Sequence, residues 1–269
     1  MAVIRTLLVL LTAWEIHAAE PATLDRGYNQ MYNLDFEDAH RTFSEYKRGH
    51  PEDPLGPVSN AAAYLFAEFD RLRILQAEFF THDENFKNPK KLSPDPAVRK
   101  AFDGELALAE QLAAKALLKQ TNDKNAMFAM ILVHGLRSDY DGLIDKHNLR
   151  AFSAMKKGRA YADRLLAIDP TYYDAYLAIG VENYMLSLKP APLRWMLQLS
   201  GAGTDKTKGI AQLRQTAEKG HYLQPFARLL MGVTALRDRN IQLAKEILSG
   251  LASQFPRNRL YAEELARLK

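Results

Sequence analysis

The chain has 269 residues, of which 47% are hydrophobic and 25% charged, and its formal net charge is +4. This composition is typical of a folded globular protein and excludes an intrinsically disordered chain. Basic and acidic residues are interspersed, whereas a nucleic-acid-binding protein concentrates its basic residues in one stripe or helix. The absence of cysteine excludes disulfides, thiolate metal sites, cysteine nucleophiles and a lipid-modified cysteine anchor.

Residues 1–19 have the pattern of an export signal. Arg5 supplies a positive charge, residues 6–14 form an apolar run, and Ala18 and Ala19 provide a small-residue end. We expect cleavage after Ala19 and a periplasmic or secreted mature protein; the alternative is an uncleaved N-terminal anchor. No later apolar run approaches the roughly 20 residues that span a bilayer, so no stable membrane insertion is expected after cleavage.

Apolar residues recur at helical spacing from residue 20 onward, and alternating strand patterns are hard to find. The sequence therefore predicts an all-α protein. Prolines at positions 51, 170 and 256 mark helix ends, because proline disfavours the α conformation in the residue before it.

A small residue stands twelve positions before each of these prolines, and the same offset marks further helix ends near positions 121 and 221. The five small residues are Ala39, Ala109, Gly158, Gly209 and Ala244. On the second helix of an antiparallel pair, a small side chain lets the first helix approach closely. The five ends are 70, 49, 51 and 35 residues apart, which predicts a repeat of uneven length.

The segment 34–39, with Phe43 and Pro51 after it, resembles the second half of a tetratricopeptide repeat, whose period is about 34 residues. Tyr176, Ile179 and Gly180 stand where that family's first helix carries its aromatic, leucine and glycine positions. Residues 169–269 also resemble a group of uncharacterised exported bacterial proteins with such repeats. The resemblance implies a single helical-repeat domain over residues 20–269, built as an irregular superhelical stack of antiparallel helix pairs. It also implies export, but it does not indicate any activity.

Two connections are longer than most links between helices. Residues 81–96 form a polar, proline-containing stretch. Residues 189–205 combine two prolines, a short apolar run and a glycine-rich end, and they place Arg194 and Trp195 between two repeat helices. Long insertions in a compact stack are often functional, so the second stretch is a candidate contact region.

The densest group of possible metal ligands is His134, Asp139, Asp141, Asp145 and His147. It lacks metal-site spacing such as two histidines four residues apart on one helix face. Turn and helix-cap roles explain the aspartates, and no nucleophile-elbow motif marks a catalytic serine. We therefore expect no metal, no cofactor and no catalytic residue.

Tyrosines crowd the segment 172–184, and Tyr222 opens the next helix pair. Aromatic, arginine and asparagine side chains suit recognition on the concave face of a helical stack. The alternative is that the tyrosines pack in the helix seams with their hydroxyls at the rim. The predicted binding residues are Asn183, Tyr184, Arg194, Trp195, Tyr222 and Arg228.

The favoured function is an exported scaffold that holds a peptide, a protein or an envelope component in a concave groove, without catalysis and without nucleic acid. One alternative is a helical enzyme acting on a cell-envelope substrate through His134, His147 and nearby acids. The other is a structural spacer in an envelope assembly. The mixed charges of residues 260–269 are typical of a capping helix, which favours a self-contained module.

Overall fold

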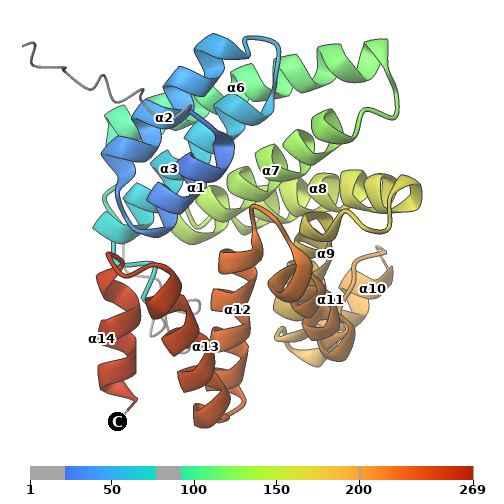
Figure 1. Ribbon diagram of the computed structural model, residues 1–269. Helices are drawn as coiled ribbons and strands as arrows, with labels where there is room; N and C mark the ends of the chain where they lie inside the picture. The colour runs from blue at the N-terminus through green and yellow to red at the C-terminus, as the bar shows by residue number, and fades with distance from the viewer. Residues whose placement is uncertain (1–21, 77–91, 200, 269) are drawn as a thin grey trace, which may run out of the picture.

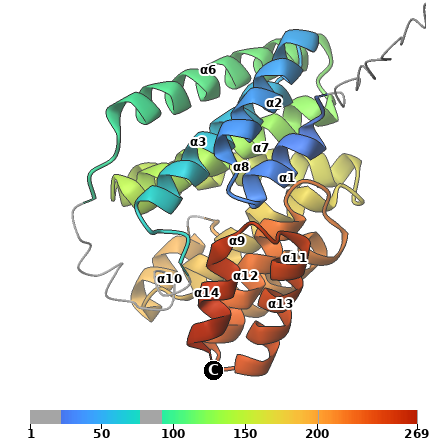
Figure 2. The same cartoon turned by 60° about the vertical axis from the view of Figure 1, so that its left-hand side comes forward.

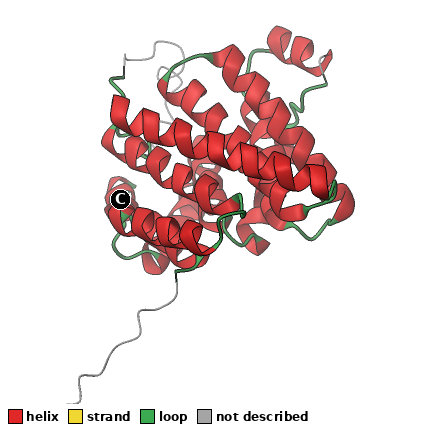
Figure 3. Cartoon of the chain, turned by 90° about the horizontal axis from the view of Figure 1, so that it is seen from above, coloured by secondary structure: helices red, strands yellow, loops and turns green. Residues whose placement is uncertain are grey.

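The computed structural model describes residues 22–76, 92–199 and 201–268. This part of the chain is helical and contains no strand (Figure 3), which confirms the predicted all-α class. The predicted export signal and most of the 81–96 connection lie outside the described residues. No helix in the described ranges is long and apolar enough to cross a membrane.

Most helices follow one another along the chain with short connections, and residues 72–95 separate α3 from α6 (Figure 1). In order they are α1 (Leu24–Tyr32), α2 (Phe36–Gly49), α3 (Leu55–Arg71), α6 (Pro96–Lys119), α7 (Lys124–Asp139), the π-helical turn η1 (Tyr140–Ile144), α8 (Asn148–Ile168), the 3-10 turn η2 (Tyr173–Ala175), α9 (Tyr176–Ser187), α10 (Ala191–Leu199), α11 (Lys206–Lys219), α12 (Gln224–Arg237), α13 (Ile241–Gln254) and α14 (Arg259–Arg267).

Helices that are near one another in the chain pack together, and these contacts include five pairs: α1 with α2, α3 with α6, α7 with α8, α9 with α11 (with α10 between them in the sequence), and α12 with α13. The second helix of every pair ends two residues before the position predicted from the sequence. Each predicted small residue lies on such a second helix and is buried. At Gly209 a Cβ atom would lie 2.6 Å from the backbone nitrogen of Tyr184 on α9, so close approach of the pair requires glycine there.

The first and last helices of the described chain meet. The Tyr32 hydroxyl donates to the carbonyl of Tyr222 at 2.9 Å, and the Asn258 side chain donates to the carbonyl of Tyr32 at 2.9 Å. Phe66 on α3 lies edge-on to Phe226 on α12, with ring centroids 5.5 Å apart. Figures 1 and 2 show α12–α14 lying beneath the layer formed by α1, α3 and α7.

One hydrophobic core runs from Leu24 on α1 to Tyr261 on α14. It contains aromatic rings from both ends of the chain, among them Tyr28 and Tyr261.

Several helices end with a residue in the left-handed region. Arg239 follows α12 with φ of 59°, and the next residue, Asn240, donates its backbone N–H to the carbonyl of Ala235 at 2.9 Å. This is the bonding pattern of a Schellman cap, which favours glycine at the left-handed position. Leu34, Arg73 and Lys146 share the positive φ, so non-glycine residues are strained at these caps.

Candidate functional site

The six predicted binding residues do not form one site. Asn183 and Tyr184 are only 2% and 5% exposed, so the prediction that they line an exposed groove is wrong. The Asn183 amide donates to the carbonyl of Ile179 and to the Gln212 side chain, at 3.1 and 2.9 Å. Both residues face α11 across the close contact at Gly209, where they hold the helix pair together.

The other four predicted residues are spread over three places. Arg194 is half-buried and donates to the carbonyl of Ser187 at the end of α9, at 3.1 Å. Trp195 is 64% exposed on α10. Arg228 donates to the Gln254 side chain at 2.7 Å, which links α12 to α13. Only Tyr222 lines a sizeable cavity.

This cavity, which we call the tyrosine pocket, has a volume of about 330 Å³ and is open to solvent. Helix ends and connections from both halves of the chain form it. Its polar and aromatic lining consists of Tyr46, Asp53, Asn125, Thr171, Tyr172, Tyr173, Asp174, Lys219, His221 and Tyr222, with Leu24 and Leu55 beside them.

The tyrosine rings are fixed by packing against the core. Tyr222 stacks on Tyr28 of α1 at 4.9 Å between centroids, and Tyr172 packs against Phe128 of α7 at 5.1 Å. Tyr46 donates its hydroxyl to Asp53 at 2.7 Å. Among the described residues, the hydroxyls of Tyr172 and Tyr222 have no hydrogen-bond partner, so both remain available to a ligand.

Asp174 fixes the backbone of residues 221–223 at the pocket. Its carboxylate accepts the backbone N–H groups of His221, Tyr222 and Leu223 at 2.9, 3.0 and 3.1 Å. Burial raises the pKa of Asp174, and these three hydrogen bonds oppose that rise. The side chain thereby fixes the turn between α11 and α12 against the start of α9.

The electrostatic environment of the pocket is negative. Burial raises the pKa of Tyr222 to about 12, and the nearby carboxylates of Asp25, Asp53 and Asp174 add to the rise. His221 pairs with Asp25 at the rim, with the two atoms 2.6 Å apart. The Lys219 ammonium lies 5.1 Å from the centroid of the Tyr173 ring, so one tyrosine of the pocket already has a cation beside it.

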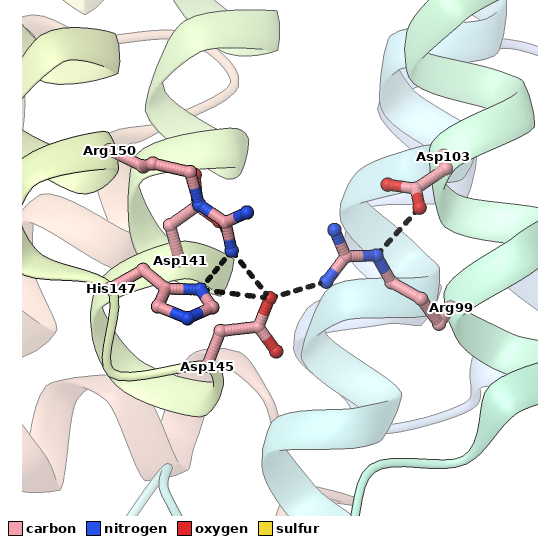
Figure 4. Close-up of polar contacts among 6 residues, drawn as sticks. All are labelled: Arg99, Asp103, Asp141, Asp145, His147 and Arg150. Atoms are coloured by element: carbon pink, nitrogen blue, oxygen red, sulfur yellow. Dashed lines mark hydrogen bonds and ion pairs between the residues drawn. The ribbon is translucent and has the colours of Figure 1, made fainter.

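The group of possible metal ligands named from the sequence comes together in part. Ligand atoms of Asp141, Asp145 and His147 lie within 4.8 Å of one another, next to the π-helical turn. Two guanidinium groups already contact these acids (Figure 4): Arg99 bonds Asp145 at 2.9 Å, and Arg150 lies 3.2 Å from Asp141. Because the arginines compensate the carboxylate charge, the cluster ties α6 to the start of α8 and offers little to a cation.

His134 and Asp139 do not take part in the contacts of that cluster. His134 is buried beside Tyr161 of α8, and burial, with Arg137 and Lys157 nearby, lowers its pKa to about 4. Burial raises the pKa of Asp139 to about 7. Of the two histidines, His147 lies beside Asp141 and Asp145 and His134 does not, so the geometry does not support the alternative in which both act together with these acids.

Comparison with known proteins gives no relative: no protein-family model, no curated protein and no solved structure matches the chain.

Proposed function

We propose that the protein is an exported, non-catalytic helical scaffold that holds a basic side chain of a partner polypeptide in the tyrosine pocket. The observation that carries the proposal is the convergence of Tyr46, Tyr172 and Tyr222 with Asp53 around one cavity. These residues come from the two halves of the chain, and the packing of Tyr222, in the α11–α12 turn, on Tyr28 of α1 brings them together.

An arginine side chain suits this pocket chemically. A guanidinium ion stacks on aromatic faces and donates several hydrogen bonds to carboxylate and hydroxyl oxygens. Asp53 accepts one bond from Tyr46 and one from the backbone of Leu55, and a carboxylate can accept about four in all. The free hydroxyls of Tyr172 and Tyr222 supply further acceptors.

The size of the pocket indicates how much of a partner it can hold. Ligand pockets typically measure about 300 to 1,000 Å³, so a cavity of about 330 Å³ is among the smallest. It accommodates one long side chain or a chain end, and the remainder of a partner would lie over the surrounding helix ends.

Architecture and export belong to the same proposal. The paired helices and the small residue on each second helix support an irregular tetratricopeptide-like stack. Export is supported by the sequence of residues 1–19. Absence of catalysis is supported by the arginine contacts of Asp141 and Asp145 and by the separate location of His134.

The test is a calorimetric titration with an acetylated, amidated Gly-Gly-Arg-Gly-Gly peptide and with the same peptide carrying citrulline, the uncharged analogue of arginine. We expect the arginine peptide to bind at least about tenfold more tightly, as a charge-assisted hydrogen bond contributes about 1.5 to 3 kcal/mol. The difference should shrink at high salt.

Two variants provide the control. Asp53→Asn should remove most of the preference for arginine, whereas Asp38→Asn, which neutralises an exposed acid on α2 outside the pocket, should leave it unchanged. Equal affinity for the two peptides, or equal loss in the two variants, would show that the pocket does not select a positive charge.

A further inference from the structure

Helix α10 presents its apolar side chains to solvent. None of its nine residues is buried, and Trp195, Met196 and Leu199 are 64%, 61% and 70% exposed. Leu193, on the same helix, is also exposed. Burial of apolar side chains is the usual source of helix stability in proteins, and the apolar side chains of α10 lack it.

The polar side chains of α10 point the other way. Arg194 donates to the carbonyl of Ser187, and the Gln198 amide donates to the Thr204 hydroxyl at 2.6 Å. Both bonds attach the helix to its own flanking segments. Arg194 and Leu197 are half-buried and the other residues of α10 are exposed, so most of its apolar side chains face water and not the protein.

The charged residues on and beside α10 are mainly basic. From Asn183 to Thr204 the sequence contains no aspartate or glutamate, and its charged residues are Lys189 and Arg194. At the start of α11, Asp205 caps the helix, Lys206 pairs with Asp238, and Lys208 follows. An apolar helix face with tryptophan and flanking basic residues is the combination that binds the interface of an anionic lipid bilayer.

The size of the exposed face favours lipid over a folded partner. Nine residues at 1.5 Å per residue make a helix about 14 Å long. A stable protein interface buries about 800 Å² on each side, which such a short helix does not supply alone. A lipid surface requires no complementary shape, and its anionic headgroups carry the opposite charge to the exposed Lys189.

We propose that α10 is a membrane-surface contact, in which the face formed by Leu193, Trp195, Met196 and Leu199 enters the headgroup region of an anionic bilayer. This goes beyond the binding of a basic side chain in the tyrosine pocket and does not depend on it. A helix about 14 Å long is too short to cross a hydrocarbon core about 30 Å thick, so α10 would lie on the surface and not span it.

The experiment uses Trp195 as its own reporter. The chain has two tryptophans, at positions 14 and 195, so Trp14→Phe leaves Trp195 as the only one. The full-length variant is mixed with vesicles of phosphatidylcholine containing about 30% phosphatidylglycerol, and with vesicles of phosphatidylcholine alone. We expect a blue shift of Trp195 emission with anionic vesicles only, and quenching when their acyl chains are brominated.

Variants in the Trp14→Phe background test the face and the charge. Met196→Ser combined with Leu199→Ser should weaken the lipid affinity at least tenfold, and Lys189→Gln should weaken it about fivefold. The matched control is Leu118→Ser combined with Leu149→Ser, which alters two leucines that are 89% and 86% exposed on other helices. This control should bind as the parent does, and circular dichroism should show the same fold for all.

Three results would overturn the proposal. The first is Trp195 emission that anionic vesicles leave unchanged, even if the protein sediments with them through its N-terminal apolar run. The second is equal loss of binding in the serine pair and its control. The third is a blue shift that depends on protein concentration and not on lipid, with a dimer seen by light scattering, because a second copy would then cover α10.

Discussion

Replacement of Asp174 tests how the pocket is held together. The carboxylate accepts three backbone N–H groups from residues 221–223, and no other acceptor is recorded for them among the described residues. In Asp174→Asn the amide nitrogen takes the place of Oδ2 and faces the Tyr222 N–H, so two donors meet at about 3.0 Å.

The magnitude follows from the number of unpaired donors. A buried polar group without its partner costs about 1 to 3 kcal/mol, and Asp174→Asn leaves one such group. Because burial already raises the pKa of Asp174, loss of the negative charge itself adds little to this cost. Asp174→Ala leaves three donors, of which that of His221 lies nearest to solvent, and should cost about 3 to 5 kcal/mol.

The assay is urea unfolding followed by circular dichroism, together with hydrogen exchange at residues 221–223. The control is Asp163→Asn, an exposed acid on α8, which should change the unfolding free energy by less than about 0.5 kcal/mol. Exchange at the α11–α12 turn should accelerate in both Asp174 variants and not in the control. If Asp174→Ala unfolds at the same urea concentration as Asp163→Asn, Asp174 does not hold the turn.

Three further predictions concern stability. Because the folded-state pKa of His134 is lowered to about 4, the unfolding free energy should fall by up to about 3 kcal/mol as the pH drops from 6.5 to 4. In urea titrations, His134→Gln should reduce this dependence of the unfolding free energy on pH. Gly209→Ala should destabilise by about 1 to 3 kcal/mol because its Cβ meets α9 backbone, whereas Gly104→Ala, which has open space, should stabilise slightly; equal effects would contradict the close approach. Arg239→Gly should raise the unfolding free energy by about 0.5 to 1 kcal/mol by relieving the left-handed cap, and an unchanged thermal midpoint would count against strain there.

The helix ends and helix pairs could be predicted from the sequence because they depend on local sterics. Proline restricts the residue before it, and a small side chain is needed where two neighbouring helices touch. Both signals lie within one helix pair, so no knowledge of the distant chain was needed to find Ala39, Gly158 or Ala244.

The meeting of the first and last helices could not be predicted in the same way. It rests on pairs such as Tyr32 with Tyr222 and Phe66 with Phe226, which are far apart in sequence. An aromatic residue at helical spacing indicates burial but does not say which element buries it. The expectation of an open groove assumed that each helix pair contacts only the next pair along the chain.

The residues of the pocket, too, could be predicted only in part. The tyrosine-rich segment contained Tyr172 and Tyr173, and Tyr222 was among the predicted binding residues. Tyr46 and Asp53 line the same pocket, but they are far from these tyrosines in the sequence, so no local pattern indicated that contact. We predicted that Asn183 and Tyr184 are exposed, because polar and aromatic side chains on a helix often lie at a binding surface. In the structure both are buried where α9 and α11 approach most closely.

The most direct test of the central claim, that α1 meets the α11–α12 turn at the tyrosine pocket, is an intramolecular cross-link. The chain has no cysteine, and the exposed side chains of Asp25 and His221 lie 2.6 Å apart at the rim. In Asp25→Cys combined with His221→Cys, a short bis-maleimide should join the two thiols within one molecule and give a faster-migrating band on a denaturing gel. Each single-cysteine variant should keep its normal mobility. If the double variant forms no internal cross-link at low protein concentration, α1 does not contact the α11–α12 turn and the tyrosine pocket does not exist in solution.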